Sequence, residues 1–70
     1  MTQEFIQRRL MYSIHQAFFD ELKDMRLSKE DATTAIRGIT EGSLSNTLRS
    51  SAYQALYEYH AYRDSIEELL

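Results

Sequence analysis

The chain has 70 residues, a formal net charge of −3 and no cysteine. This length supports a single domain, 1–70, with a small core of its own, because a domain of about 60 residues buries only about 60% of the surface that its unfolded chain exposes. The lack of cysteine excludes disulfides and cysteine-based metal sites, and two histidines are too few for a structural metal site.

The sequence also lacks proline and valine, which favours helix throughout. No apolar run approaches the roughly 18 residues of a membrane span, and the N-terminus has no signal-peptide core. We therefore expect a soluble cytoplasmic protein that does not bind membranes. The basic residues are scattered along an acidic chain, so we do not expect it to bind nucleic acid either.

The first predicted helix covers about residues 3–26. Its apolar residues recur at three- and four-residue steps, the pattern of one helical face: Ile6, Leu10, Met11, Ile14, Ala17, Phe18, Leu22 and Met25. A second, aromatic strip has seven-residue spacing and consists of Phe5, Tyr12 and Phe19. A helix with apolar residues on most of its circumference is typically central in a fold or shared with a partner.

The second predicted helix is short, covering about 28–38. Ser28 is expected to be its N-cap, with Leu27 before it as a hydrophobic staple. Gly38 and Gly42 are the two glycines of the chain, and we expect them in the connection that follows, at left-handed positions.

The third predicted helix covers about 44–69, with Ser43 or Ser45 as its cap. Its apolar residues follow the spacing of a coiled-coil heptad seam: Leu48, Ala52, Ala55, Tyr59, Tyr62, Ile66 and Leu69. These lengths predict an all-α fold, a long hairpin of two antiparallel helices with a short middle helix in a small three-helix bundle. Because the short helix cannot cover the groove between two long ones, we expect the bundle to form a homodimer or to bind another protein.

The tyrosines of the third helix divide into two groups. Tyr59 and Tyr62 lie on the heptad seam, which predicts core packing. Tyr53 and Tyr57 lie off the seam, in line with His60. Together with the aromatic strip of the first helix they form a candidate interface, because aromatic residues are favoured anchors in protein interfaces. The alternative is that these two strips pack against each other or on the second helix.

The C-terminal segment is a further candidate interface. Glu67 and Glu68 lie in the last turn of the third helix, beside the negative end of the helix dipole, which is mildly unfavourable. Leu69 and Leu70 would contribute little in a fraying helix end. We hypothesise that this tail docks against a basic, apolar surface on another chain.

The sequence contains no pattern that indicates catalysis, a cofactor or a metal. His60 and Asp64 have the spacing of two metal ligands, but nothing supplies a third, and His15 reads as a boundary residue of the first helix. There is no nucleophile with a base and no glycine-rich phosphate loop. We expect a non-enzymatic protein.

The function that these features favour is a small interaction module, such as a bacterial or phage regulator or inhibitor that binds another protein. One alternative is a dimeric transcription regulator of the helix-turn-helix type, because residues 32–53 contain helix, glycine-bearing turn and helix. Another is an assembly or chaperone subunit.

Overall fold

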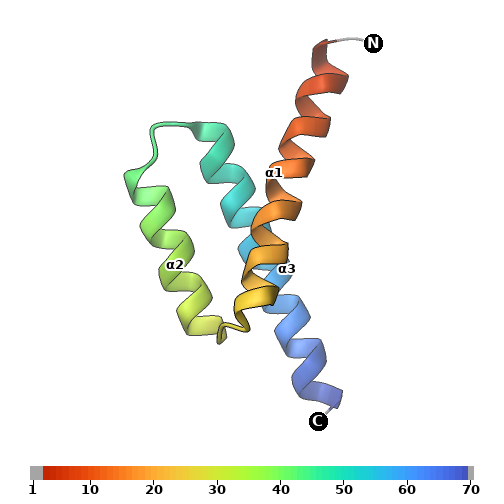
Figure 1. The fold of residues 1–70 in the computed structure, drawn as a ribbon, viewed down its shortest axis with the longest axis vertical. Coiled ribbons are helices and arrows are strands. Elements are labelled where there is room, and N and C mark those ends of the chain that lie inside the picture. The colour runs from red at the N-terminus through yellow and green to blue at the C-terminus, as the bar shows by residue number, and fades with distance from the viewer. Residues whose placement is uncertain (1–2, 70) are drawn as a thin grey trace.

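The computed structural model describes the backbone of residues 3–69 and the side chains of residues 13–69. This part of the chain forms three helices and no strand: α1 (Gln3–Met25), α2 (Lys29–Gly42) and α3 (Asn46–Leu69) (Figure 1). The prediction of a small all-α bundle of three helices is confirmed. Within this part, none of the helices is both long enough and apolar enough to cross a bilayer.

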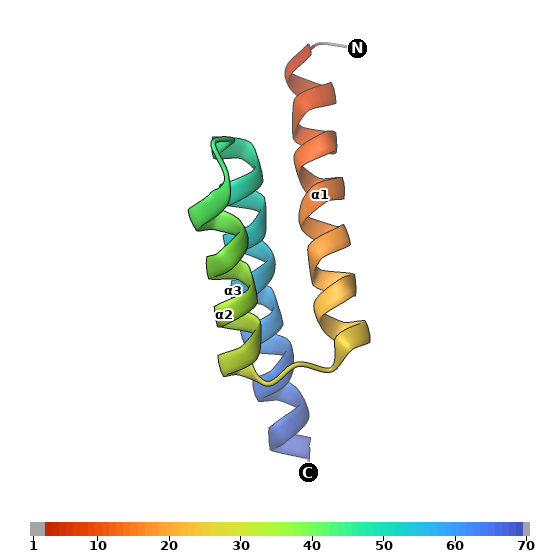
Figure 2. The same cartoon turned by 60° about the vertical axis from the view of Figure 1, so that its left-hand side comes forward.

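The helix α2 runs antiparallel to α3. Its first residue, Lys29, contacts Asp64 near the end of α3, whereas Thr40 near its end contacts Tyr53 near the start of α3. The two helices therefore lie side by side along the whole length of α2, as Figure 2 shows.

The two long helices run in the same direction, which differs from the predicted antiparallel hairpin. His15 of α1 contacts Glu58 of α3, and Lys23, two turns further along α1, lies over the ring of Tyr62, one turn further along α3. The physical reason is that α2 intervenes as a full antiparallel helix. The chain reverses twice and returns to its original direction (Figure 1).

The helix α2 ends at Gly42, four residues beyond the predicted end at position 38. Gly38 and Gly42 are helical, and neither has a positive φ, so the prediction that they form a left-handed turn is wrong. Ile36 and Thr40 are both buried against the core, and this packing outweighs the roughly 1 kcal/mol that a glycine costs within a helix. The left-handed residue is instead Arg26, with a φ of 54°, directly after α1.

Serine hydroxyls cap the starts of α2 and α3. The Ser28 hydroxyl accepts a hydrogen bond from the Asp31 amide at 3.1 Å, which confirms the predicted cap of α2. At the start of α3 the Ser45 hydroxyl accepts a hydrogen bond from the Leu48 amide at 3.2 Å. Of the two predicted candidates, Ser43 and Ser45, the N-cap is therefore Ser45. Each bond satisfies an amide that has no partner within the helix.

The core lies where α3 meets both other helices. It consists of buried apolar residues from all three: Leu22, Ala32, Ile36, Ala52, Leu56 and Tyr59. The predicted seam holds for the middle of α3, because Ala52, Ala55 and Tyr59 are buried. Leu56 was not on that seam. It is buried because α2 covers a second side of α3.

The core-facing side of α1 coincides only in part with the predicted apolar face. Among its side chains from position 13 onward, His15 and Leu22 are buried, and Phe18 and Phe19 pack against the same core. Ala17 and Met25, which belong to the predicted apolar face, are exposed. The reason is that α3 is the main neighbour of α1 and α2 does not cover its remaining apolar side.

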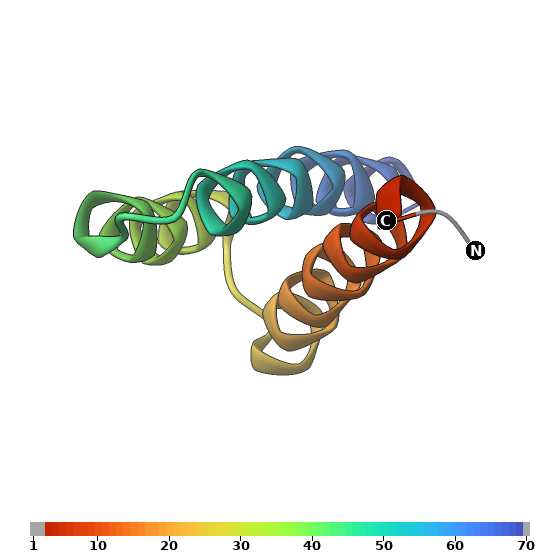
Figure 3. The same ribbon diagram turned by 90° about the horizontal axis from the view of Figure 1, so that it is seen from above.

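The molecule is elongated and flat, with principal extents of 45 × 27 × 16 Å. Its radius of gyration is 13.2 Å, whereas a compact domain of this length has about 11 Å. Viewed from above, α2 and α3 form one layer and α1 leaves that layer at an angle (Figure 3). Because the molecule is flat and α1 leaves the layer of α2 and α3, the sides of the helices remain open to solvent.

Candidate protein-interaction surfaces

The helices α1 and α3 are joined by an aromatic cluster of three rings. Phe19 of α1 meets Tyr59 and Tyr62 of α3 edge-on, with ring centroids 6.4 Å and 5.8 Å apart. The Lys23 ammonium group lies 5.3 Å from the centroids of both Phe19 and Tyr62. Edge-on packing and the cation over the rings both favour this helix pair.

The hydroxyl of Tyr59 ties α3 to the connection between α1 and α2. Tyr59 is only 1% exposed, and its hydroxyl donates a hydrogen bond to the Leu27 carbonyl at 2.6 Å. The ring thus fills the core while its polar end is satisfied, as expected for a buried tyrosine. The role of Tyr59 is structural.

His15 is buried between α1 and α3, and not at a boundary as the sequence indicated. Its Nε2 contacts the carboxylate of Glu58, which also accepts a hydrogen bond from Gln54. Glu58 lies 43 positions away in the sequence, so no short-range pattern could have identified the pair.

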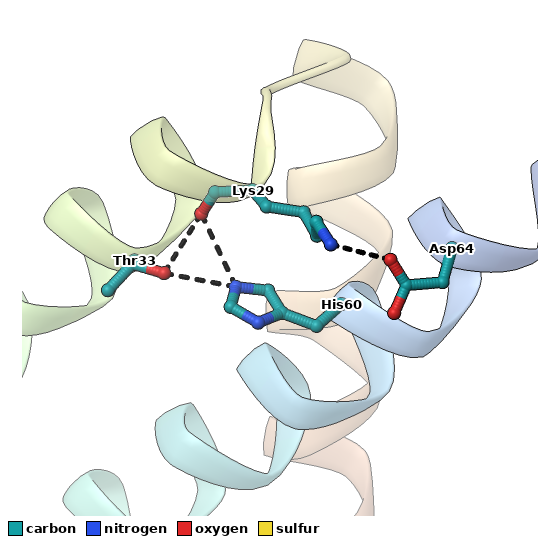
Figure 4. A network of polar contacts seen from close by, with 4 residues as sticks. All are labelled: Lys29, Thr33, His60 and Asp64. Carbon is teal, nitrogen blue, oxygen red and sulfur yellow. Dashed lines mark hydrogen bonds and ion pairs between the residues drawn. The ribbon is translucent and has the colours of Figure 1, made fainter. Parts of the chain in front are cut away.

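A polar network fixes the start of α2 against α3 (Figure 4). The Thr33 hydroxyl donates to the Lys29 carbonyl at 2.9 Å, so its oxygen is free to accept from His60 Nε2, 3.0 Å away. The same nitrogen is 3.3 Å from the Lys29 carbonyl, and both neighbours accept hydrogen bonds. His60 therefore carries its proton on Nε2 and joins α3 to α2.

The ion pair in this network is formed by Lys29 and Asp64, whose charged atoms are 2.6 Å apart. The hydrogen bond and the charge of Asp64 raise the pKa of Lys29 above its ordinary value of 10.5. Both side chains are partly exposed, so the pair fixes the geometry of the two helices more than their stability.

Four residues form a line along α3 beside α2, at positions 53, 57, 60 and 64. Tyr53, His60 and Asp64 each contact a residue of α2. Tyr57 is different. Its side chain is 70% exposed, and no hydrogen bond joins it to another described residue. The other three residues of this line connect α3 to α2, and the side chain of Tyr57 is left exposed between them.

The other predicted interface residues lie in different places. Phe19 packs in the aromatic cluster with Tyr59 and Tyr62, so it is separate from Tyr53 and Tyr57. Leu69, near the end of α3, is 87% exposed. The side chains of Phe5 and Tyr12, and all of Leu70, lie outside the described residues.

A second exposed surface lies on α1 and was not predicted as a site. A hollow of about 260 Å³, open to solvent, is lined by Ile14, Ala17, Phe18 and Glu21. Apart from Glu21 the lining is apolar. The signal in the sequence was the broad apolar arc of this helix, but only the packed structure shows which part of the arc stays open.

Among residues 13–69, no three histidine or acidic side chains come together in a way that could hold a metal ion. Comparison with known proteins found no matching family model, no matching curated protein and no matching solved structure.

Proposed function

We propose that the protein is a non-enzymatic interaction module, a regulator or inhibitor that acts by binding another protein through the outer face of α3. The centre of this face is Tyr57, flanked by Tyr53. Glu68, eleven positions further along α3 and on the same side of the helix, would extend the contact toward the end of the helix. The exposed Leu69 lies about 120° around α3 from Tyr57 and would reach only the edge of this contact.

The observation that carries the proposal is the exposure of Tyr57 on a part of α3 that is connected to α2 by three side-chain contacts. Tyr53 is 44% exposed and Tyr57 is 70% exposed, one helical turn apart. Tyrosine is enriched among residues that dominate binding energy, because it provides a large contact area at little entropic cost. The contacts from Tyr53, His60 and Asp64 to α2 hold this part of α3 in place before any partner binds.

The charge of the same face suggests the chemistry of the partner. The last turns of α3 contain Asp64, Glu67 and Glu68, and the only one of these paired with a cation in the described part is Asp64. A partner surface with an apolar pocket for Tyr57 and nearby lysine or arginine side chains would match it.

The geometry of α2 and α3 does not favour the transcription-regulator alternative. In helix-turn-helix proteins the two helices cross at about 90–120°, whereas α2 and α3 are in contact along the whole length of α2. The role of an assembly or chaperone subunit also works through protein contacts and is tested by the same experiment.

The test is a quantitative pull-down from extracts of the organism that encodes the protein, comparing wild type with Tyr57→Ala. We expect a specific protein retained by the wild type to be lost at least about tenfold with the variant, because truncating a central aromatic anchor costs about 2 kcal/mol or more. Since Tyr57 is 70% exposed and forms no hydrogen bond with another residue of 13–69, the variant should keep its helicity and melting temperature.

The matched control is Leu44→Ala, which shortens another exposed side chain, in the connection between α2 and α3 at the other end of the molecule. This variant should retain the partner. Equal retention by wild type and Tyr57→Ala would show that the outer face of α3 is not the binding surface. Retention of DNA that weakens steeply with salt would support the transcription-regulator alternative instead.

A further inference from the structure

The polar side chains that join α2 to α3 pair in one register, in which each step forward along α2 corresponds to an equal step back along α3. The pairs are Lys29 with Asp64, Thr33 with His60, and Thr40 with Tyr53. Figure 4 shows the first two of them. The register therefore holds along α2 from its first residue to its last turn.

Arg37 occupies a step of this register at which α3 offers no polar partner. It follows Thr33 by one helical turn on the same side of α2, and the register places it opposite position 56. Leu56 is buried and has no polar side-chain atom. Arg37 is exposed, and it takes part in neither of the two ion pairs among residues 13–69. Glu41, one turn further along α2, is likewise not paired with it.

Arg37 and Tyr57 project from the same face of the layer that α2 and α3 form. Each directly follows a buried residue, Ile36 or Leu56, and so lies about 100° around its helix from that residue. The hydrogen bond between His60 and α2 lies on this side of both helices. The face thus presents an arginine beside a tyrosine, two of the residue types most enriched among those that dominate binding energy.

We propose that the partner of this face supplies a carboxylate side chain, from aspartate or glutamate, that pairs with Arg37 while Tyr57 fills the adjacent apolar pocket. This inference rests on the proposed function and names the chemistry of the partner at one point of the same surface. A guanidinium group forms two parallel hydrogen bonds with a carboxylate. The neighbouring aromatic contact excludes water from the pair, which strengthens the attraction between its charges.

The charges of the face also determine the orientation of the partner. Arg37 lies beside Tyr57, whereas Glu68 lies eleven positions further along α3, or about 16 Å along the axis. A matching partner carries a carboxylate at one end of its contact and a lysine or arginine at the other. The reversed orientation would bring like charges together, so it is disfavoured.

The first test is the affinity of Arg37→Gln for the protein that the wild type retains, measured by pull-down and then by calorimetry. We expect a loss of at least about tenfold, because the partner's carboxylate would be left without its counter-charge. Arg37→Lys should keep part of the affinity, since an ammonium group keeps the charge but not the two parallel bonds. Helicity and melting temperature should not change, because Arg37 is exposed.

The matched control is Arg26→Gln, which removes the same charge at another exposed position, in the connection between α1 and α2. This variant should retain the partner. Loss of binding with Tyr57→Ala but not with Arg37→Gln would overturn this inference and leave the proposed function in place. Retention of the partner by both of these variants would overturn the two together.

The second test reverses the charges on both sides of the contact. Arg37→Glu should abolish binding, and lysine in place of one acidic residue of the captured protein should restore it. Failure of every such substitution to restore binding would overturn the proposal. Phosphatase treatment of the extract before the pull-down separates a carboxylate from a phosphate group. Unchanged retention supports the carboxylate, whereas loss of the partner would assign a phosphate group to Arg37 instead.

Discussion

Tyr57 and Tyr59 are two positions apart on α3 and have opposite environments. Two residues correspond to a rotation of about 200° around a helix, so one side chain points to solvent while the other lies in the core. Tyr59 is 1% exposed and its hydroxyl is bound to the Leu27 carbonyl, whereas Tyr57 is 70% exposed. Residue type alone does not distinguish a structural tyrosine from a candidate binding residue. The side of the helix on which the tyrosine lies does.

This difference predicts unequal effects for the same substitution. Tyr59→Phe removes the donor from the partly buried Leu27 carbonyl, which should lower the free energy of unfolding by about 1–2 kcal/mol. Tyr57→Phe is the control and should change it by less than about 0.5 kcal/mol. Urea denaturation followed by circular dichroism measures both. Similar losses in the two variants would contradict the assigned role of Tyr59.

The Lys29–Asp64 ion pair makes stability depend on pH in the alkaline range. Asp64 raises the pKa of Lys29 in the folded state above its ordinary value of 10.5. The folded chain therefore holds this proton more tightly than the unfolded chain. The contribution of the pair is fully present below pH 10.5 and is lost as pH rises through the higher folded-state pKa.

Lys29→Met tests this dependence. Between about pH 10 and pH 12, the stability of the wild type should fall more steeply than that of the variant, as measured by urea midpoints. All other titratable groups are the same in the two proteins, so their effects cancel in the comparison. Parallel curves would show that the ion pair does not contribute in solution.

At the scale of the helices, the residue at which a helix starts was easier to predict than the residue at which it ends. Ser28 and Leu27 indicated the start of α2 because capping is local chemistry, in which a hydroxyl meets an amide three residues later. The end of α2 was not predictable in this way. Gly38 resembles a terminator in the sequence, but Ile36 and Thr40 on either side of it are buried against α3, and this packing extends the helix.

Because Gly38 is helical and has no special conformation, we predict that Gly38→Ala stabilises the protein. A Cβ atom at this position would meet nothing within 4 Å. Alanine should therefore raise the free energy of unfolding by about 0.5–1 kcal/mol, the usual difference between the two residues within a helix. Thermal denaturation checks this.

The comparison for this prediction is Gly42→Ala at the last residue of α2, where helix ends fray and the gain should be smaller. A loss of stability in Gly38→Ala would mean that position 38 adopts a turn in solution, as its residue type first indicated.

At the scale of the whole molecule, helix directions decide which surfaces remain open. In the structure α3 is central, α2 lies antiparallel to it and α1 lies parallel to it. The layer of α2 and α3 supports Tyr57 on its outer face, while α1, which leaves the layer at an angle, carries the hollow (Figure 3). The outer face of α3 is the surface that we propose binds another protein.

The sequence by itself determined the all-α class, the number of helices and the start of α2, and it narrowed the cap of α3 to Ser43 or Ser45. It also identified the buried middle of the seam on α3, from Ala52 to Tyr59. These properties depend on residues within about one turn of each other, through hydrogen bonds to helix ends and through the repeat of apolar positions. Such local interactions can be predicted from the order of residues.

Only the tertiary structure decided how the helices are arranged and what they leave uncovered. The parallel course of α1 and α3, the contact of His15 with Glu58 and the burial of Leu56 depend on residues far apart in the chain. So does the open hollow beside Phe18. A helix with a broad apolar arc can pack on several of its sides, and the choice among them is made by the neighbours that the folded chain brings to it.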